Sequence, residues 1–349
     1  MSEIPQNPLS RRKFIKTGAV ATGLVGAGIA GAVIAKRRSQ VPKTAHSRPS
    51  NPFAYNIEHL QKTDPRLIHY QQAGQIRSPH DEPRRIAIGA DDALYIAAGN
   101  YVSILEPNGS LISEIALGAP ARCVGVARDG DIFISLRDHL EIFSRKGQRR
   151  ASWDAPAGRP FFTGIAFGDS EVFAADAGNR VVVRYDRTGK LLGRIGEKNP
   201  ERNIPGFIVP SPFFDVDLAS DGLLRVSNPG RHRVEVYTTK GDLEFFWGDA
   251  SANIEGFCGC CNPINVAMMP DGRCITCEKG LPRVKVYRSD GTFESVVAGP
   301  ESFIENAKAC SGDASECHQG GLDAAIDSRG RIYVLDLVAN EIRIMTPKV

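Results

Sequence analysis

The sequence has almost no excess of charge of either sign. Its 43 Lys and Arg residues stand against 40 Asp and Glu residues, for a net charge of +3. Residues 1–38 contain seven of the basic residues and one acid, Glu3, a net +6 that leaves −3 for residues 39–349. Nucleic-acid binding requires a concentration of basic residues. We therefore expect no nucleic-acid partner.

Strong compositional bias is also missing. With 42% hydrophobic and 24% charged residues, the chain is close to the globular average, which excludes disordered, collagen-like and coiled-coil proteins. There is no G-x-S-x-G nucleophile motif. Glycine and proline are plentiful, at 35 and 22 residues, and they are spread evenly, as many short strands and turns require. A length of 349 residues suits one large or two ordinary domains.

The N-terminus resembles the twin-arginine export signal of bacteria. Ser10-Arg11-Arg12-Lys13-Phe14-Ile15-Lys16 precedes an uncharged apolar run, residues 17–35. The resemblance implies export of a folded protein, often with its cofactor already inserted. Lys36-Arg37-Arg38 directly after the run disfavours cleavage, and 19 apolar residues can span a bilayer. The protein is expected to be periplasmic, or anchored in the inner membrane through residues 17–35 and facing the periplasm.

The rest of the chain is repetitive. We divide it into residues 1–38 (signal or anchor), 39–65 (a proline-containing tether) and 66–349 (a repeat domain). Each repeat has a turn such as Asp221-Gly222, a short apolar strand, a polar loop, a third strand and a second turn, hence four strands, as in a propeller blade. The blades are expected at 83–118, 120–155, 159–198, 209–249, 261–300 and 321–349, the last one completed by 66–77.

These units predict a closed, all-β propeller of six blades. The last unit ends after its third strand, and an N-terminal strand around Ile68–Gln72 supplies the fourth, which removes an exposed sheet edge. The units resemble the NHL repeat family, with Val172–Leu192 as the clearest copy. The resemblance implies the fold but says little about function, because propellers include lyases, lactonases, sensors and scaffolds.

One position of the innermost strand is polar or thiol-bearing in every blade. Strand alternation directs these side chains into the central channel. They form a candidate ring for a metal ion or polar ligand: Arg85, Cys123, Thr163, Asp215, Asn265 and Asp323. The alternative is a ring that satisfies itself, with Arg85 paired to Asp323 of the adjacent blade.

Seven of the eight cysteines lie between residues 258 and 317. Cys258, Cys260 and Cys261 occupy the connection between blades 4 and 5, and Cys310 and Cys317, with His318, occupy the next connection. Both connections open on the same face of the propeller, and Cys277 is expected near it. Six of these cysteines and one histidine are our candidate ligands for a metal or iron–sulfur site: Cys258, Cys260, Cys261, Cys277, Cys310, Cys317 and His318.

Two further residues are weaker candidates. Cys274 falls at an apolar core position, and its C-x-x-C spacing with Cys277 places the two side chains on opposite faces of a strand. His80 aligns with Cys260 and His318 before blades 1, 5 and 6, which are consecutive around the ring. Mixed thiolate and imidazole ligands would suit zinc or copper.

Three interpretations of the cysteines remain open. They hold zinc, copper or an iron–sulfur cluster; they are disulfides that staple long loops; or they form a redox-active dithiol. A metal or iron–sulfur site would make the protein an exported redox or electron-transfer protein with a periplasmic redox partner. Structural disulfides would make it a non-catalytic binding scaffold. A third function, a metal-dependent lyase or hydrolase working in the channel, is the minor alternative. Whether the protein is an enzyme, and on what substrate, the sequence leaves open.

Overall fold

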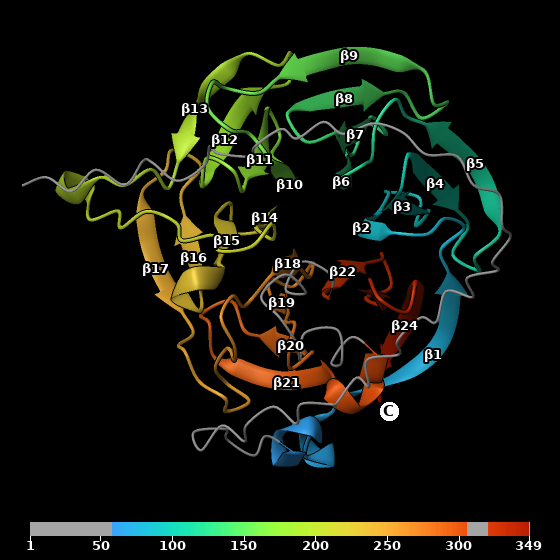
Figure 1. Ribbon diagram of the computed structural model, residues 1–349, viewed down its shortest axis with the longest axis vertical. Helices are drawn as coiled ribbons and strands as arrows, with labels where there is room; N and C mark the ends of the chain where they lie inside the picture. Colours follow the sequence, from blue (N-terminus) through green and yellow to red (C-terminus); the bar gives the residue numbers. More distant parts are fainter. Residues whose placement is uncertain (1–57, 306–319, 349) are drawn as a thin grey trace, which may run out of the picture. The chain divides into compact units, whose positions relative to one another are not determined.

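A computed structural model describes residues 58–305 and 320–348. These residues form six four-stranded antiparallel sheets with almost no helix, arranged around a central axis as a six-bladed β-propeller (Figure 1). The predicted fold class is confirmed. No helix among the described residues is long and apolar enough to cross a membrane. The predicted signal and most of the tether lie outside the described residues.

In blades 1 to 5, four consecutive strands run from the axis outward. Blade 1 is β2 (Pro83–Ile88), β3 (Leu94–Ala98), β4 (Tyr101–Leu105) and β5 (Leu111–Ala116). Blade 2 is β6 (Cys123–Val126), β7 (Ile132–Ser135), β8 (His139–Phe143) and β9 (Arg149–Asp154). Blade 3 is β10 (Phe162–Phe167), β11 (Glu171–Asp176), β12 (Val181–Asp186) and β13 (Leu191–Ile195). Blade 4 is β14 (Val216–Leu218), β15 (Leu224–Asn228), β16 (Arg233–Tyr237) and β17 (Leu243–Trp247). Blade 5 is β18 (Asn265–Met268), β19 (Cys274–Cys277), β20 (Val284–Tyr287) and β21 (Phe293–Ala298).

Blade 6 is assembled from both ends of the repeat domain. Its inner strands are β22 (Leu322–Ile326), β23 (Ile332–Asp336) and β24 (Glu341–Pro347), and β1 (Tyr70–Arg77) pairs antiparallel with β24 as the outermost strand. The blue β1 beside the red β24 in Figure 1 makes this closure visible. Short 3₁₀ turns occur at Glu58–Gln61, Pro65–Leu67, Pro200–Arg202, Pro229–Arg231 and Pro300–Ser302.

The core consists of apolar layers between adjacent blades. Inner and middle strands are buried on both faces, so residues such as Ile96, Val226 and Val334 are fully inaccessible to solvent. Glycines in the outer turns complete the contact between blades. Gly291, with φ of 86°, lies against Trp247 of the preceding blade, where a Cβ atom would approach the indole to 2.6 Å. Only glycine combines that backbone conformation with such a close approach.

One face of the propeller carries the connections between blades, which include residues 117–122, 155–161, 196–215 and 248–264; we call it the inter-blade face. A repeated hydrogen bond attaches these connections. The residue at the end of the second strand, or directly after it, accepts a bond from the backbone N–H of the incoming connection. The pairs are Phe161 N to Asp176 Oδ1 (2.9 Å), Ile208 N to Asn228 Oδ1 (3.0 Å) and Cys258 N to Glu278 Oε2 (3.3 Å).

Candidate functional site

The six polar ring residues stand at the same level of the innermost strands. Arg85, Cys123, Asn265 and Asp323 pair with the equivalent residue of the second strand in their blades, and Thr163 and Asp215 lie beside that position. Their side chains are buried, and only that of Arg85 retains 13% exposure.

Arg85 extends across the channel and contacts four other blades. Its Nη1 donates to Asn265 Oδ1 (2.8 Å) and to the Thr163 carbonyl (3.1 Å), and its Nη2 donates to Asp215 Oδ2 (3.0 Å). Its Nε lies 3.1 Å from Asp323 Oδ2, which is the ion pair that a self-satisfied ring requires. One guanidinium group therefore links blades 3, 4, 5 and 6 to blade 1.

The two carboxylates also accept backbone hydrogen bonds from neighbouring strands. Val266 N donates to Asp215 Oδ2 (3.0 Å), and Ile86 N donates to Asp323 Oδ2 (2.8 Å). Burial raises the pKa of Asp323 to about 6, although Arg85 opposes the shift. The hollow at the inter-blade mouth of the channel holds only about 50 Å³, the space of one or two waters. The channel is thus filled by its own side chains.

Three of the candidate thiols are core residues. Cys123, Cys274 and Cys277 are at most 1% exposed. Cys274 packs in the layer between blades 4 and 5, and Cys277 packs in the layer that joins blades 5, 6 and 1, so the C-x-x-C pair does face opposite sides of β19. Burial raises the pKa of Cys277 far above its usual range and that of Cys123 to about 12. Protonated, enclosed thiols of this kind are unreactive.

The connection between blades 4 and 5 brings two other thiols together. Cys260 Sγ and Cys261 Sγ are 3.3 Å apart, with Cys260 exposed and Cys261 buried. The backbone N–H of Cys258 donates to Glu278 Oε2 (3.3 Å). No disulfide joins any two of the six cysteines that the structure describes.

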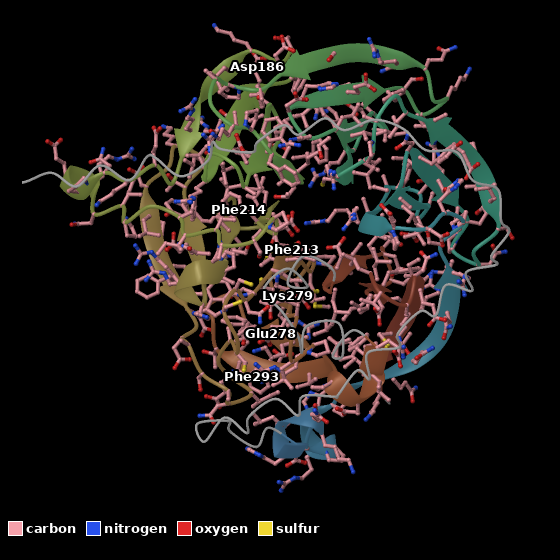
Figure 2. All side chains as sticks on the ribbon, viewed as in Figure 1. Asp186, Phe213, Phe214, Glu278, Lys279 and Phe293 are labelled. Atoms are coloured by element: carbon pink, nitrogen blue, oxygen red, sulfur yellow. The ribbon has the colours of Figure 1, made fainter. Side chains whose placement is uncertain are left out.

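A cation and a hydroxyl lie beside Cys261. Burial by itself would raise the pKa of this thiol, but the Lys279 ammonium and the Ser211 hydroxyl outweigh burial and hold the pKa below its usual value. Lys279 is itself only 3% exposed, and its Nζ lies 4.6 Å from the centre of the Phe213 ring. Figure 2 shows Lys279 and Phe213 next to each other toward the inner ends of the blades.

The backbone around the two thiols is firmly held. Asn262 Nδ2 donates to the Lys279 carbonyl (2.9 Å), and Lys279 N donates to Asn262 Oδ1 (2.9 Å). Beneath them, Glu278 is fully buried between Arg283 (2.7 Å) and Lys285 (2.9 Å). The cation next to the thiols is therefore positioned by a hydrogen-bonded frame rather than by a mobile surface loop.

The candidate histidine His80 does not join this site, whereas His232 Nε2 lies 2.7 Å from the carbonyl oxygen of Gly259, next to Cys260. His80 Nε2 pairs with Glu114 Oε1 at 2.7 Å, and its ring stacks on Tyr101 with centroids 4.1 Å apart. Cys310, Cys317 and His318 lie outside the described residues. Across 58–305 and 320–348, no three His, Cys, Asp or Glu side chains are grouped so as to hold a metal ion.

Sequence reasoning missed Glu278, Lys279 and Ser211. Aligning the blades could have identified Glu278, because it occupies the same position as Asp176 and Asn228, which accept a hydrogen bond from the inter-blade connection. Lys279 and Ser211 had no such signal. They belong to irregular loops of blades 5 and 4, and only folding brings them to Cys261.

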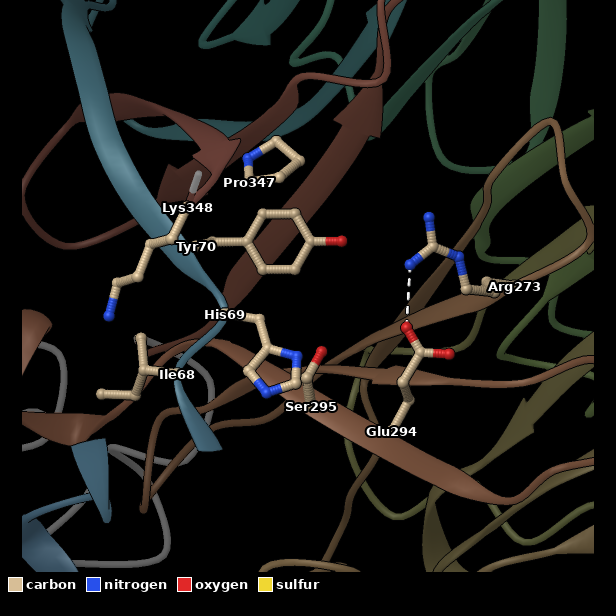
Figure 3. A pocket seen from close by; sticks show the side chains of 8 residues that line it. All are labelled: Ile68, His69, Tyr70, Arg273, Glu294, Ser295, Pro347 and Lys348. Carbon is tan, nitrogen blue, oxygen red and sulfur yellow. Dashed lines mark hydrogen bonds and ion pairs between the residues drawn. The ribbon is translucent and has the colours of Figure 1, made fainter. Parts of the chain in front are cut away.

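A separate hollow of about 410 Å³ lies at the closure seam between blades 5 and 6 (Figure 3). Tyr70, Arg273 and Glu294 line it, together with the C-terminal end of β24. Arg273 already donates to Glu294 Oε1 (2.8 Å) and to Asp271 Oδ2 (2.9 Å). The main charges of this hollow are thus paired with each other, and no candidate site residue lines it.

Comparisons with known proteins give the fold and no more. No family model and no curated protein matches the sequence. Among solved structures, a streptogramin B lyase has a TM-score of 0.55 at 14% identity, covering 80% of this chain and 98% of the lyase. Virginiamycin B lyase from Staphylococcus aureus has a TM-score of 0.54 at 14% identity, covering 80% of this chain and all of the other. At such identity the likeness extends to the propeller fold alone.

Proposed function

We propose that this chain is an exported propeller that carries out dithiol–disulfide exchange at Cys260 and Cys261. The observation that carries the proposal is the 3.3 Å separation of an exposed and a buried thiol, with a cation beside the buried one. A disulfide requires an S–S distance of about 2.05 Å, so a small movement brings the two sulfurs within bonding distance. Exchange with another disulfide then takes up the two electrons and two protons that the pair loses. The pair is then a two-electron redox group.

The asymmetry of the pair supports a direction for the exchange. In the oxidised form, the thiolate of a partner attacks the exposed Cys260 Sγ, and Cys261 leaves as a thiolate. A thiol with a lowered pKa is the better leaving group, and Lys279 stabilises the charge that forms. A second thiolate of the partner then attacks its own sulfur in the mixed disulfide and releases Cys260. The partner loses two electrons and two protons to form a disulfide, and Cys260 and Cys261 end as thiols.

The N-terminal sequence supports an oxidising compartment as the place where this exchange occurs. We propose twin-arginine export and a location in the periplasm, or at the inner membrane facing it, with another periplasmic protein as the redox partner. Disulfides persist in that oxidising compartment. The NHL-type repeats would supply the rigid platform. Reoxidation of the pair requires a second disulfide, from a protein or a low-molecular-weight compound.

A metal or iron–sulfur site is the competing proposal from the sequence. The described residues offer two adjacent thiols, and a complete ligand set for zinc, copper or iron would require Cys310, Cys317 or His318. Lyase or hydrolase chemistry in the channel is not proposed, because Arg85 and its partners fill that space.

The test uses purified full-length protein, a synthetic peptide with two cysteines and oxidised glutathione as the final oxidant. We expect the protein to accelerate peptide disulfide formation, and mass spectrometry to find Cys260 joined to Cys261. Cys260→Ser should abolish the acceleration. Lys279→Gln should slow it about three- to tenfold and raise the pKa of Cys261 in thiol alkylation, because the leaving thiolate loses its cation.

Lys240→Gln is the matched control, since Lys240 is an exposed lysine on a turn of the opposite face. Stoichiometric zinc, copper or iron in the purified protein would overturn the exchange function in favour of the metal site. An unchanged rate in Cys260→Ser would overturn it as well.

A further inference from the structure

A second feature of the inter-blade face is a hollow over blades 2, 3 and 4. Its volume is about 530 Å³, within the range of small-molecule sites. Arg137, Arg159 and Phe161 line one side, and Pro210, Ser211 and Pro212 line the other. It adjoins the small hollow at the channel mouth, because Phe161 and Pro212 belong to both.

Arginine side chains gather around Phe161. The guanidinium carbons of Arg122 and Arg137 lie 5.4 and 5.7 Å from the centre of its ring. The Nε atom of Arg122 is buried and has no hydrogen-bond partner. A buried guanidinium nitrogen without a partner indicates that the neighbouring described residues leave this cation incompletely satisfied.

These cations have almost no carboxylate to balance them. Within the described residues, no Asp or Glu comes within 4.0 Å of the guanidinium groups of Arg122, Arg137 or Arg159, whereas arginines such as Arg184 and Arg187 are paired. Asp138, the carboxylate in the lining, pairs with His139 at 2.9 Å. Burial lowers the pKa of Arg122, the charges of Arg84 and Arg137 lower it further, and Glu82 opposes the shift without forming an ion pair with Arg122.

The remaining lining is apolar and stiff. Pro160, Pro210 and Pro212 fix the backbone of the two connections, and Val209 and Ala177 add apolar surface. Rigid walls reduce the conformational entropy lost when a ligand binds. The hollow therefore combines unpaired guanidinium groups with apolar walls in one largely preformed space.

We propose that this hollow binds a small organic acid, with a carboxylate or phosphate held by Arg137 and Arg159 and an apolar body against Phe161 and the prolines. Arg122 adds its positive charge from the adjoining small hollow at the channel mouth. The guanidinium fork suits both anions, and the aromatic ring suits a planar or hydrocarbon group. This inference does not depend on dithiol exchange, although Ser211 lies between the hollow and Cys261.

The test is calorimetric titration of the full chain with benzoate and phenyl phosphate as probes. Inorganic phosphate tests the need for an apolar body, and benzylamine tests the need for negative charge. We expect both organic anions to bind and both control compounds to bind at least about tenfold more weakly. Arg137→Gln and Arg159→Gln should each weaken binding about tenfold or more, because each loses a charge-assisted hydrogen bond.

Arg128→Gln is the matched control, since that side chain is 96% exposed on the opposite face. Phe161→Leu gives a second line of evidence, with weaker binding of phenyl phosphate and little change for inorganic phosphate. Thermal unfolding verifies that each variant is folded. The proposal is overturned if neither organic anion binds at about 10 mM, if inorganic phosphate binds as well as phenyl phosphate, or if Arg128→Gln weakens binding as much as Arg137→Gln.

Discussion

Replacing Arg85 with methionine should destabilise the whole propeller. The substitution removes the only cation within the polar ring and leaves Asp215 and Asp323, at 1% and 0% exposure, without their partner. At 3.0 and 3.1 Å, with an effective dielectric constant of about 20, each pair attracts by roughly 5 kcal/mol. The cost of burying the guanidinium offsets much of this. Breaking a buried pair from one side typically costs about 3–5 kcal/mol, and we expect a loss in that range at pH 8.

The loss should depend on pH in a defined direction. Burial already raises the pKa of Asp323 to about 6 from 3.8, and removing Arg85, which lowers it, raises it further. The native state then binds more protons than the unfolded state between pH 4 and that higher pKa. Stability consequently falls as the pH rises through this window. The difference between variant and wild type should be smaller at pH 5 than at pH 8.

Urea unfolding followed by tryptophan fluorescence measures this free energy. Trp153 and Trp247 are both buried, in blades 2 and 4, so unfolding exposes them. Arg128→Met serves as the surface control, and adding Asp323→Asn to Arg85→Met should restore part of the loss. A loss below about 1 kcal/mol at pH 8, or one that is the same at pH 5, would refute the account of Arg85 as the charge that holds the channel together.

Three further experiments, two with substitutions and one with a deletion, test other parts of the structure. Glu278→Gln leaves Arg283 and Lys285 buried beside a neutral group, so we expect a loss of about 3–5 kcal/mol in urea unfolding; an unchanged midpoint would mean that these cations reach solvent. Gly291→Ala should lower the melting temperature more than Gly222→Ala does. Both glycines have positive φ, but only at Gly291 would a Cβ atom lie against a tryptophan. Equal decreases in melting temperature would contradict this packing. Deleting residues 66–77 removes β1 and exposes the edge of β24, so size-exclusion chromatography should show aggregates, whereas a stable monomer would argue against closure by this strand.

Much of the fold was accessible from local patterns. The Asp-Gly turns and alternating apolar strands recur in every unit, and a final unit with three strands requires a fourth from elsewhere. The same alternation predicted that Cys274 and Cys277 face opposite sides of β19, as their separate core layers confirm. The polar ring was found by register alone, but register could not show that one arginine would reach four other blades.

The cysteine site stays a prediction, because Cys310, Cys317 and His318 lie outside the described residues. Counting residues identified a cysteine-rich connection, but it could not show that Cys260 and Cys261 bring their sulfurs to 3.3 Å. Cys277, named as a candidate ligand, is a fully buried thiol in the described structure, because it packs in the apolar layer that joins blades 5, 6 and 1. His80 pairs with Glu114 in its own blade rather than approaching Cys260.

The sequence by itself determined the number of blades, their order and the strand that closes the ring. These properties follow from short-range periodicity, which each repeat carries independently of the others. Tertiary structure decided the chemistry: that Lys279 and Ser211 lie beside Cys261, that Arg85 fills the channel, and that Arg122 and Arg137 meet at Phe161. Those contacts join loops of irregular length from different blades, and their electrostatics depend on burial, which no local pattern encodes.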